Sequence, residues 1–263
     1  MKKYWALIGL CILVLAGCAS GPIVDRSLSA KSQASRVNYI IIHYTVLDLP
    51  ASIKELVYGG VSSHYLVTDG PNARIMGLVD ESQRAHHAGQ SYWKGNTALN
   101  GSSIGIEIVN PGFRRLADGT PVWAAFEPKQ IELVIALVKD IAKRHGVAPE
   151  RVLGHSDIAP QRKEDPGPMF PWKQLADAGL VQWPDATVVA RKQPDYEAKL
   201  PDVAWFQRKL AVHGFQVPQN GVLDAATLRV LSAFQMKYRP SKFDGIPDAQ
   251  TAALLAALTG SAD

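Results

Sequence analysis

Hydrophobic positions follow two different spacings between residues 37 and 183, and each spacing predicts one type of element. The apolar, largely β-branched run from Val37 to Ile42 is typical of a strand buried on both faces. Shorter apolar or alternating runs predict further strands, and a sheet is therefore expected here. These strands are His64–Val67, Arg74–Leu78, Ile104–Val109 and Arg151–His155.

Helical patterns lie between these strands. Residues Pro128–His145 place apolar side chains on one stripe, with proline at the first position and Gly146 after the last. Ser52–Glu55 has the spacing of a capping box and predicts a short helix that opens at Ser52, and Trp172–Ala178 is expected to form another. Because strands alternate with helices, residues 37–183 are predicted to form an α/β domain, a central β-sheet flanked by helices.

The C-terminal part of the chain has a different pattern. Residues 184–200 are polar and contain prolines, which predicts a linker. Beyond it the segment 221–234 recurs as 245–258, and each copy has a glycine turn, an aspartate at a helix N-cap and an amphipathic helix. Together with Val203–His213 the repeat predicts a small three-helix module over residues 201–260. The module has no cluster of acid, base and metal ligands, so we expect it to position a substrate and not to react.

The N-terminus has the pattern of a secretion signal. Lys2 and Lys3 precede an apolar stretch that ends at Leu15 and is too short to span a bilayer as a mature helix.

The residues that follow this stretch resemble the lipobox of bacterial lipoproteins. Leu15–Cys18 has the lipobox pattern, with cleavage before the cysteine that carries the lipid. The resemblance implies a signal peptide over residues 1–17, fatty-acyl chains such as palmitate on Cys18, and a tether over residues 18–36. Ala19 after the cysteine implies an outer-membrane location, facing the periplasm. A plain signal peptide cut elsewhere is the alternative.

Charge and cysteine content exclude some classes of partner. The formal net charge is +4 and falls to about +2 once Lys2 and Lys3 leave with an acid-free signal. No Arg/Lys cluster with interleaved aromatics is present, so a nucleic-acid partner is not supported. Cys11 would leave with the signal and Cys18 would be acylated, which leaves no thiol for a disulfide. We expect a monomer stabilised by its core and a bound metal.

Three residues of the kinds that bind catalytic zinc stand on supports predicted to be rigid. His43 follows the strand that begins at Val37, and His155 ends a second strand, at the sheet edge where α/β proteins present functional groups. Asp165 lies in a proline-rich loop, whose restricted φ angles lower the entropy cost of holding a carboxylate. Two imidazoles, one carboxylate and an open position are typical of hydrolytic zinc sites. The sequence therefore predicts that His43, His155 and Asp165 bind Zn²⁺.

Two further residues have a functional and an ordinary interpretation. Alternation within Ser103–Val109 places Glu107 on the face opposite the isoleucines. It is either a solvated carboxylate on an edge strand or a partly buried general base. Lys163, two residues before Asp165, is either a surface charge or a cation positioned to stabilise an oxyanion.

The order of these motifs resembles that of the type 2 N-acetylmuramoyl-L-alanine amidases, whose fold is shared with peptidoglycan recognition proteins. The C-terminal repeat is similar to a three-helix peptidoglycan-binding module. The resemblance implies a mixed central sheet, Zn²⁺ on His43, His155 and Asp165, catalysis by Glu107, and transition-state stabilisation by Lys163. It also implies hydrolysis of the amide between N-acetylmuramic acid and L-alanine in peptidoglycan or muropeptides. The motifs are Tyr39–Thr45, Ser62–Val67, His87–Gly89, Ile104–Glu107, and His155 with Lys163–Pro168.

The remaining histidines and tryptophans have weaker signals. His87 is expected either to line the cleft or to support a metal ligand from behind. Trp93 and Trp123 are candidates for stacking on sugar or peptide, although single tryptophans usually belong to the core. The other histidines are expected in structural positions: His64 in or beside the core, His145 near a helix C-terminus, and His213 in the first helix of the C-terminal module.

Two other functions are compatible with this set of residues. A recognition protein of the same fold would bind peptidoglycan without cutting it, but such proteins usually lack a zinc ligand and this chain has all three, with Glu107 besides. A zinc peptidase acting elsewhere in the stem peptide is the second, because the ligand set does not identify the amide that is cleaved.

Overall fold

The computed structural model describes residues 22 and 24–260 of the chain. The segment 1–17 and Cys18 lie outside the described residues. Residues 24–33 belong to a separate N-terminal unit and form no helix or strand, and the remaining described residues belong to one compact unit. None of the described helices has the length and apolar content needed to cross a membrane.

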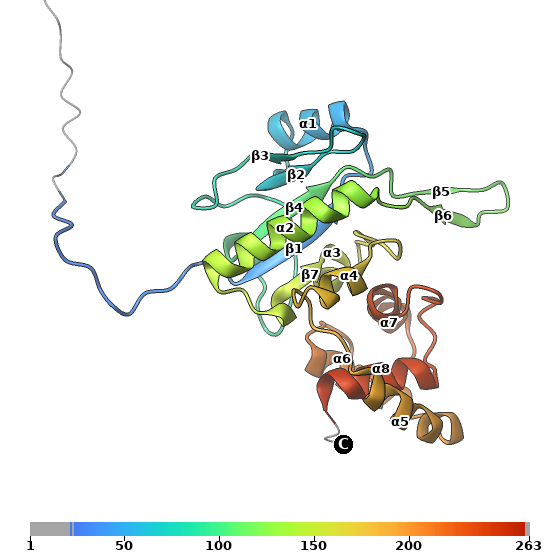
Figure 1. Ribbon diagram of the computed structural model, residues 1–263. Coiled ribbons are helices and arrows are strands. Elements are labelled where there is room, and N and C mark those ends of the chain that lie inside the picture. Colours follow the sequence, from blue (N-terminus) through green and yellow to red (C-terminus); the bar gives the residue numbers. More distant parts are fainter. Residues whose placement is uncertain (1–21, 23, 261–263) are drawn as a thin grey trace, which may run out of the picture. The chain divides into compact units, whose positions relative to one another are not determined.

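A five-stranded sheet forms the centre of the compact unit (Figure 1). Its strand order is β3-β2-β4-β1-β7, and β3 is the one antiparallel strand among otherwise parallel neighbours. The predicted mixed sheet is therefore confirmed. Its strands are β1 (Tyr39–Tyr44), β2 (Tyr65–Val67), β3 (Ile75–Gly77), β4 (Ser103–Ile108) and β7 (Val152–Gly154).

Each face of the sheet has its own core because side chains alternate along the strands. Ile40 and Ile42 of β1 and the isoleucines of β4 pack on one face against α2 (Pro128–His145), which lies along the sheet in Figure 1. Tyr39 and Ile41 point to the opposite face. His43 and Glu107 have the same parity as Ile41 and Gly105, so both project from the face that α2 leaves uncovered.

Helix α2 has the predicted boundaries. Pro128 stands at its first position, and Glu127 and Gln130 form a reciprocal capping box before the apolar stripe. Gly146 ends the helix with φ 69°, a left-handed conformation that favours glycine.

The prediction that the first helix opens at Ser52 is wrong. Helix α1 (Leu49–Tyr58) begins earlier, because Asp48 accepts a hydrogen bond from the Ala51 amide at 2.9 Å and a proline follows in the first turn. Ser52 is buried inside the helix, where its hydroxyl donates to the Leu47 carbonyl at 3.3 Å. An aspartate upstream of the proline is thus the cap that the local pattern missed.

Several other boundaries shift by one or two residues. His155 does not end a strand but opens the short helix α3 (His155–Ile158) directly after β7.

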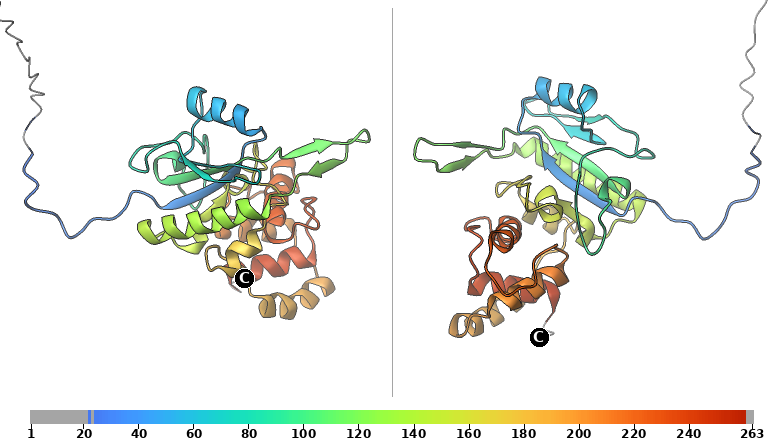
Figure 2. Two further views of the ribbon diagram at one scale, coloured as in Figure 1. Left: turned by 45° about the horizontal axis from the view of Figure 1, so that its top comes forward. Right: turned by 180° about the vertical axis from the view of Figure 1, so that it is seen from behind.

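A two-stranded hairpin extends away from the sheet (Figure 2). The remaining elements before residue 184 are η1 (Leu99–Gly101), β5 (Phe113–Arg115), β6 (Pro121–Trp123), η2 (Pro149–Arg151) and α4 (Trp172–Asp177).

The second face of the sheet shares its core with the C-terminal helices. Ile41, Leu153 and Ile158 belong to the same buried cluster as Phe206 and Phe234. The three predicted helices are present as α6 (Val203–His213), α7 (Ala225–Tyr238) and α8 (Ala249–Thr259).

The segment 184–200, predicted to be a linker, contains a further helix. Helix α5 (Ala186–Ala198) is capped by Asp185, whose carboxylate accepts from the Thr187 amide at 2.7 Å, and it includes Pro194. It packs extensively against α8. Only one face of α5 contacts the rest of the protein, so most of its residues are polar. A polar sequence of this kind is equally compatible with a loop.

The internal repeat corresponds to a repeated polar clamp. Asp224 and Asp248 cap α7 and α8 as predicted. In the first copy, the buried Gln207 amide accepts from the Gly221 backbone at 2.8 Å and donates to the Thr227 hydroxyl at 2.9 Å. Gln235 makes the same pair of bonds in the second copy, so the repeated glycine and threonine each satisfy a buried amide.

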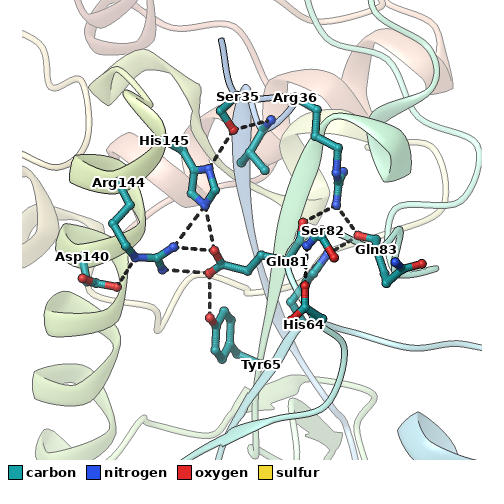
Figure 3. Close-up of polar contacts among 12 residues, drawn as sticks. Ser35, Arg36, His64, Tyr65, Glu81, Ser82, Gln83, Asp140, Arg144 and His145 are labelled. Atoms are coloured by element: carbon teal, nitrogen blue, oxygen red, sulfur yellow. Dashed lines mark hydrogen bonds and ion pairs between the residues drawn. The ribbon is translucent and has the colours of Figure 1, made fainter. Parts of the chain in front are cut away.

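Figure 3 shows the polar network around Glu81 that holds the C-terminal end of α2. His145 lies in the last turn, as predicted, and its Nε2 is 2.7 Å from Glu81 Oε2. Arg144 and the Tyr65 hydroxyl also donate to the Glu81 carboxylate. These hydrogen bonds, led by Arg144, lower the pKa of Glu81 to about 2, so the network stays charged at neutral pH.

Candidate active site

Three neighbouring strands bring the predicted site residues into one row. In the parallel β1–β4 ladder His43 is the register partner of Glu107. On the other side of β1, Ile42 pairs with Gly154, and His155 is the next residue along. Parallel strands place the carboxyl ends of neighbours at the same edge, so Glu107, His43 and His155 stand side by side.

His43, His155 and Asp165 converge on a single point. His43 Nδ1 lies 2.9 Å from His155 Nδ1 and 3.0 Å from Asp165 Oδ2, and His155 Nδ1 lies 3.1 Å from the same oxygen. All three residues are buried. The predicted ligand set is therefore brought together as a triangle of donor atoms that could hold a metal ion.

The partners of the outer imidazole nitrogens assign the tautomer of His43. Ser103 donates its hydroxyl to the Leu99 carbonyl at 2.5 Å, so its oxygen accepts from His87 Nε2 at 3.1 Å. His87 Nδ1, left without a proton, then accepts from His43 Nε2 at 3.0 Å. His155 Nε2 lies 3.2 Å from the Ala88 carbonyl oxygen, which can only accept, and 3.3 Å from Arg162 Nη2, which can only donate. The inner Nδ1 atom of His43 therefore presents a lone pair to the centre of the triangle.

Electrostatics within the triangle favours a bound cation. Burial, followed by the neighbouring His155, lowers the pKa of His43 to about 4, so this imidazole is neutral at pH 7. Burial raises the pKa of Asp165, but the two histidines outweigh burial and hold that pKa below its ordinary value. The three donor atoms lie 2.9 to 3.1 Å apart, and lone pairs at this spacing repel one another unless a cation lies between them.

The loop that carries Asp165 is fastened to the strand end that carries His155. The Ser156 amide donates to the Asp165 carbonyl at 2.8 Å, and the Lys163 amide donates to the Ala159 carbonyl at 3.0 Å. The Arg162 guanidinium donates to the carbonyls of Ala88 and Gln90. The loop is therefore anchored on both sides of the carboxylate.

Glu107 is a half-buried acid in a central strand, so its interpretation as a solvated edge residue is wrong. Its strand, β4, lies between β2 and β1. The Oε2 atom of Glu107 is enclosed and has no hydrogen-bond partner among the described residues. Burial, and secondarily the charge of Asp165, raises the pKa of Glu107 to about 8. A carboxyl group with a pKa near neutrality can both accept and release a proton at working pH.

A cavity of about 190 Å³ joins these groups. Lys163 is exposed at its margin and opposes the raised pKa of Glu107 through its charge. Helix α1 and neighbouring loops also contribute side chains to the cavity. The lining of the cavity includes Glu107, His87, Lys163, Leu47, Leu56 and Val61.

His87 both lines this cavity and supports His43, so the two roles considered for it are combined. Gly105 makes room for its ring, since a Cβ there would stand 2.5 Å from His87 Cγ. Ser103, the last side chain of this chain of hydrogen bonds, was missed because a serine in a β-strand has no distinctive signal.

Trp93 does not contact the cavity, so its assignment to substrate binding is wrong. Its side chain is 2% exposed and packs at 5.1 Å and 5.5 Å, centroid to centroid, on Phe215 and His213 of the C-terminal module. His213 is thus a core residue of α6, as expected. His64 is also buried, and its Nδ1 accepts from the Gly105 amide at 3.0 Å.

The fold and the site together define a hydrolase-type centre, with a three-ligand cluster beside a protonatable carboxyl group. A family model for N-acetylmuramoyl-L-alanine amidase matches residues 33–168, and a model for a peptidoglycan binding domain matches residues 199–255. The chain is 41% identical to the N-acetylmuramoyl-L-alanine amidase AmiD of Escherichia coli over 98% of both chains.

Solved structures agree with this comparison. The complex of E. coli AmiD with the substrate anhydro-N-acetylmuramic acid-L-Ala-D-gamma-Glu-L-Lys matches with a TM-score of 0.81 at 42% identity, over 89% of this chain and 93% of that chain. AmpDH3 of Pseudomonas aeruginosa matches with a TM-score of 0.83 at 38% identity, over 90% and 98%. The chain belongs to the N-acetylmuramoyl-L-alanine amidase family and is an enzyme of that class.

Proposed function

We propose that this enzyme uses zinc to hydrolyse the amide between N-acetylmuramic acid and L-alanine, in peptidoglycan and in soluble muropeptides. The observation that carries the proposal is the triangle of donor atoms beside the enclosed carboxyl of Glu107. By analogy with the substrate in the AmiD complex, we take the stem peptide to begin with L-alanine followed by a γ-linked D-glutamate.

Zinc suits the donor set. Two imidazole nitrogens and one carboxylate oxygen are the ligands of many catalytic zinc sites. The edges of the triangle, 2.9 to 3.1 Å, are close to the roughly 3.3 Å expected between ligands of a tetrahedral zinc ion. Neutral His43, held in the correct tautomer by His87, needs no deprotonation to bind. Zinc held by these residues would supply Lewis-acid chemistry, polarising the scissile carbonyl and acidifying water.

The residues of the chain supply the proton transfers and the charge stabilisation. Glu107, with its raised pKa, takes a proton from the attacking water and later delivers it to the departing amine of L-alanine. Lys163 at the cavity margin places an ammonium where negative charge develops on the carbonyl oxygen. Leu47, Leu56 and Val61 give the cavity a partly apolar lining, which strengthens both effects.

Mass spectrometry of digested sacculi tests this function. The amidase reaction releases intact stem peptides and leaves unsubstituted glycan. Cleavage within the stem peptide would instead identify the enzyme as a peptidase, and binding without any product would identify a recognition protein.

We further propose that the enzyme acts as an outer-membrane lipoprotein facing the periplasm. The lipobox Leu15–Cys18 and Ala19 support this location, and residues 19–36 would provide the tether to the catalytic domain. A Cys18→Ser variant should leave the membrane fraction while its activity on soluble muropeptides is unchanged. Continued sedimentation of the variant with outer membranes would contradict a lipid anchor on Cys18.

A further inference from the structure

A cavity of about 310 Å³ lies outside the metal site, and we call it the outer cavity. It shares no lining residue with the metal-site cavity. An intermediate cavity of about 420 Å³, with Trp123 in its lining, shares Asp165 with the metal-site cavity and Arg162 with the outer cavity. The uncharged polar side chains that line the outer cavity are Gln90, Ser91, Tyr92, Thr97, Gln161 and Gln216.

The walls of the outer cavity are tied together by backbone hydrogen bonds. The Tyr92 amide donates to the Ile158 carbonyl at 2.8 Å, which joins two segments of the catalytic domain. The Lys94 amide donates to the Gly214 carbonyl at 3.0 Å. Gln216 follows Gly214 by two residues, so the C-terminal module supplies one wall at a defined position. A cavity with fixed walls binds its ligand at a smaller cost in ordering.

The polar side chains of this lining have free hydrogen-bonding capacity. The Gln161 amide nitrogen donates to the Ala226 carbonyl at 3.0 Å, which leaves the Gln161 side-chain oxygen as an acceptor. A primary amide offers two donors and one acceptor oxygen, and a hydroxyl can both donate and accept. Four side chains of the lining make no hydrogen bond within the part of the chain that the structure describes: Gln90, Tyr92, Thr97 and Gln216.

The outer cavity favours a neutral ligand. None of the described residues that line it is acidic. Its one charged side chain, Arg162, donates to the carbonyls of Ala88 and Gln90 and is therefore already engaged. Uncharged polar groups beside apolar surface suit a sugar ring, which presents hydroxyls at its rim and C–H groups on its faces. The apolar part of the lining consists of Ile158, Ala159 and Pro160.

The polymer on which this enzyme family acts contains such a sugar. The glycan of peptidoglycan alternates N-acetylmuramic acid with N-acetylglucosamine, and N-acetylglucosamine is neutral and carries no stem peptide. The volume of about 310 Å³ is at the lower end of the roughly 300–1,000 Å³ of small-molecule sites, which suits a single sugar ring. The walls of the cavity come from both matched regions, the amidase region 33–168 and the peptidoglycan-binding region 199–255.

We infer that the outer cavity binds an N-acetylglucosamine residue of the glycan without reacting with it, and that Gln90 and Gln216 hydrogen-bond to this sugar from the two domains. A second contact of this kind holds a glycan chain against the enzyme and raises the effective concentration of cleavable amides at the metal site. The inference rests on the proposed amidase function for the choice of polymer, and not for any step of the reaction.

Tri-N-acetylchitotriose tests the assignment, because it consists of N-acetylglucosamine alone and has neither a stem peptide nor a lactyl amide. Titrated into the isotope-labelled, zinc-loaded, full-length protein, it should shift the NMR amide resonances of residues 90–97, 158–162 and 216 in a saturable way. Cellotriose, which lacks the acetamido groups, should bind at least roughly threefold more weakly. The inference is overturned if these segments show no saturable shifts, if the largest shifts occur at the metal-site cavity, or if cellotriose binds equally well.

Three glutamine variants locate the contacts. Gln90→Ala and Gln216→Ala should each raise Kd for chitotriose by about fivefold, since each removes a hydrogen bond to the sugar. Both side chains are exposed, and thermal unfolding checks that both variants fold like the parent. Gln174→Ala is the matched control, because Gln174 is an exposed glutamine of α4 that lines none of the three cavities.

The outcomes separate the sugar site from the amidase function. Equal Kd values for Gln90→Ala, Gln216→Ala and the control would contradict the assigned contacts. Chitotriose binding requires no turnover, so it can be measured whether or not the enzyme cleaves sacculi. Saturable binding at the outer cavity together with uncut sacculi would therefore contradict the proposed reaction while supporting the sugar site.

Discussion

The buried ion pair between the C-terminal module and the catalytic domain allows a quantitative prediction. Lys237 Nζ of α7 lies 2.7 Å from Asp157 Oδ2 of α3, and the two side chains are only 4% and 2% exposed. The ammonium also lies 4.3 Å from the centroid of the Trp172 ring. Asp157 Oδ2 accepts a further bond from the Gly154 amide at 2.8 Å, directly before the metal ligand His155.

Replacing Lys237 by methionine removes the ammonium and keeps most of the apolar stem. The Asp157 carboxylate is then buried with a single backbone donor, and breaking a buried pair in this way typically costs about 3–5 kcal/mol. Because 1 kcal/mol shifts the midpoint of a domain of this size by roughly 2–4 °C, Lys237→Met should lower Tm by on the order of 10 °C. The double variant Asp157→Asn/Lys237→Met buries no charge and should recover much of the loss.

Scanning calorimetry and urea unfolding of the zinc-loaded protein measure this effect. Lys173→Met is the matched control: Lys173 pairs with Asp177 within α4, but both side chains are more than half exposed, so its loss should cost less than about 1 kcal/mol. Zinc affinity of Lys237→Met should also fall, because Asp157 holds the turn before His155. A loss for Lys237→Met no larger than for the control, or a double variant no more stable than the single one, would refute the reasoning.

Three further predictions concern the catalytic centre. Asp165→Ala should abolish stoichiometric zinc and activity together, and full zinc content by atomic absorption in that variant would remove Asp165 from the ligand set. Glu107→Gln should keep its zinc but lose turnover by roughly a hundredfold or more, whereas activity within about twofold of the parent would make Glu107 structural. In metal-depleted protein the pKa of Glu107, about 8 against an ordinary 4.5, means that the folded state holds the extra proton between these values. The free energy of unfolding of the parent should therefore fall, relative to that of Glu107→Gln, by up to about 1.4 kcal/mol per pH unit from pH 5 to pH 8. A pH-independent difference in urea unfolding would contradict the buried, protonated carboxyl.

The ligands could be predicted from sequence because each follows a local rule. His43 lies near the end of a buried strand, His155 directly follows another, and Asp165 stands in a proline-rich loop. Their meeting point could not be derived from local patterns. It depends on β1 lying between β4 and β7, an order set by long-range pairing and implied in the sequence only by the family resemblance.

Two features that the sequence did not reveal share one physical cause. Trp93 and the segment of α5 both owe their environment to the C-terminal module, through residues that lie far away in the sequence. No periodicity near Trp93 reveals that Phe215 will cover it. Ser103 is similar, since its hydroxyl matters only because the fold brings His87 over Gly105.

The space above Gly105 has a consequence for building such a site elsewhere. A Cβ at this position would overlap the His87 ring, which holds the tautomer of His43. Copying only the two histidines and the aspartate onto another sheet would therefore reproduce the ligands without the proton arrangement that makes them bind. A transplanted centre would also need a strand position without a side chain, so the minimal portable motif includes a residue whose contribution is the volume that it leaves empty.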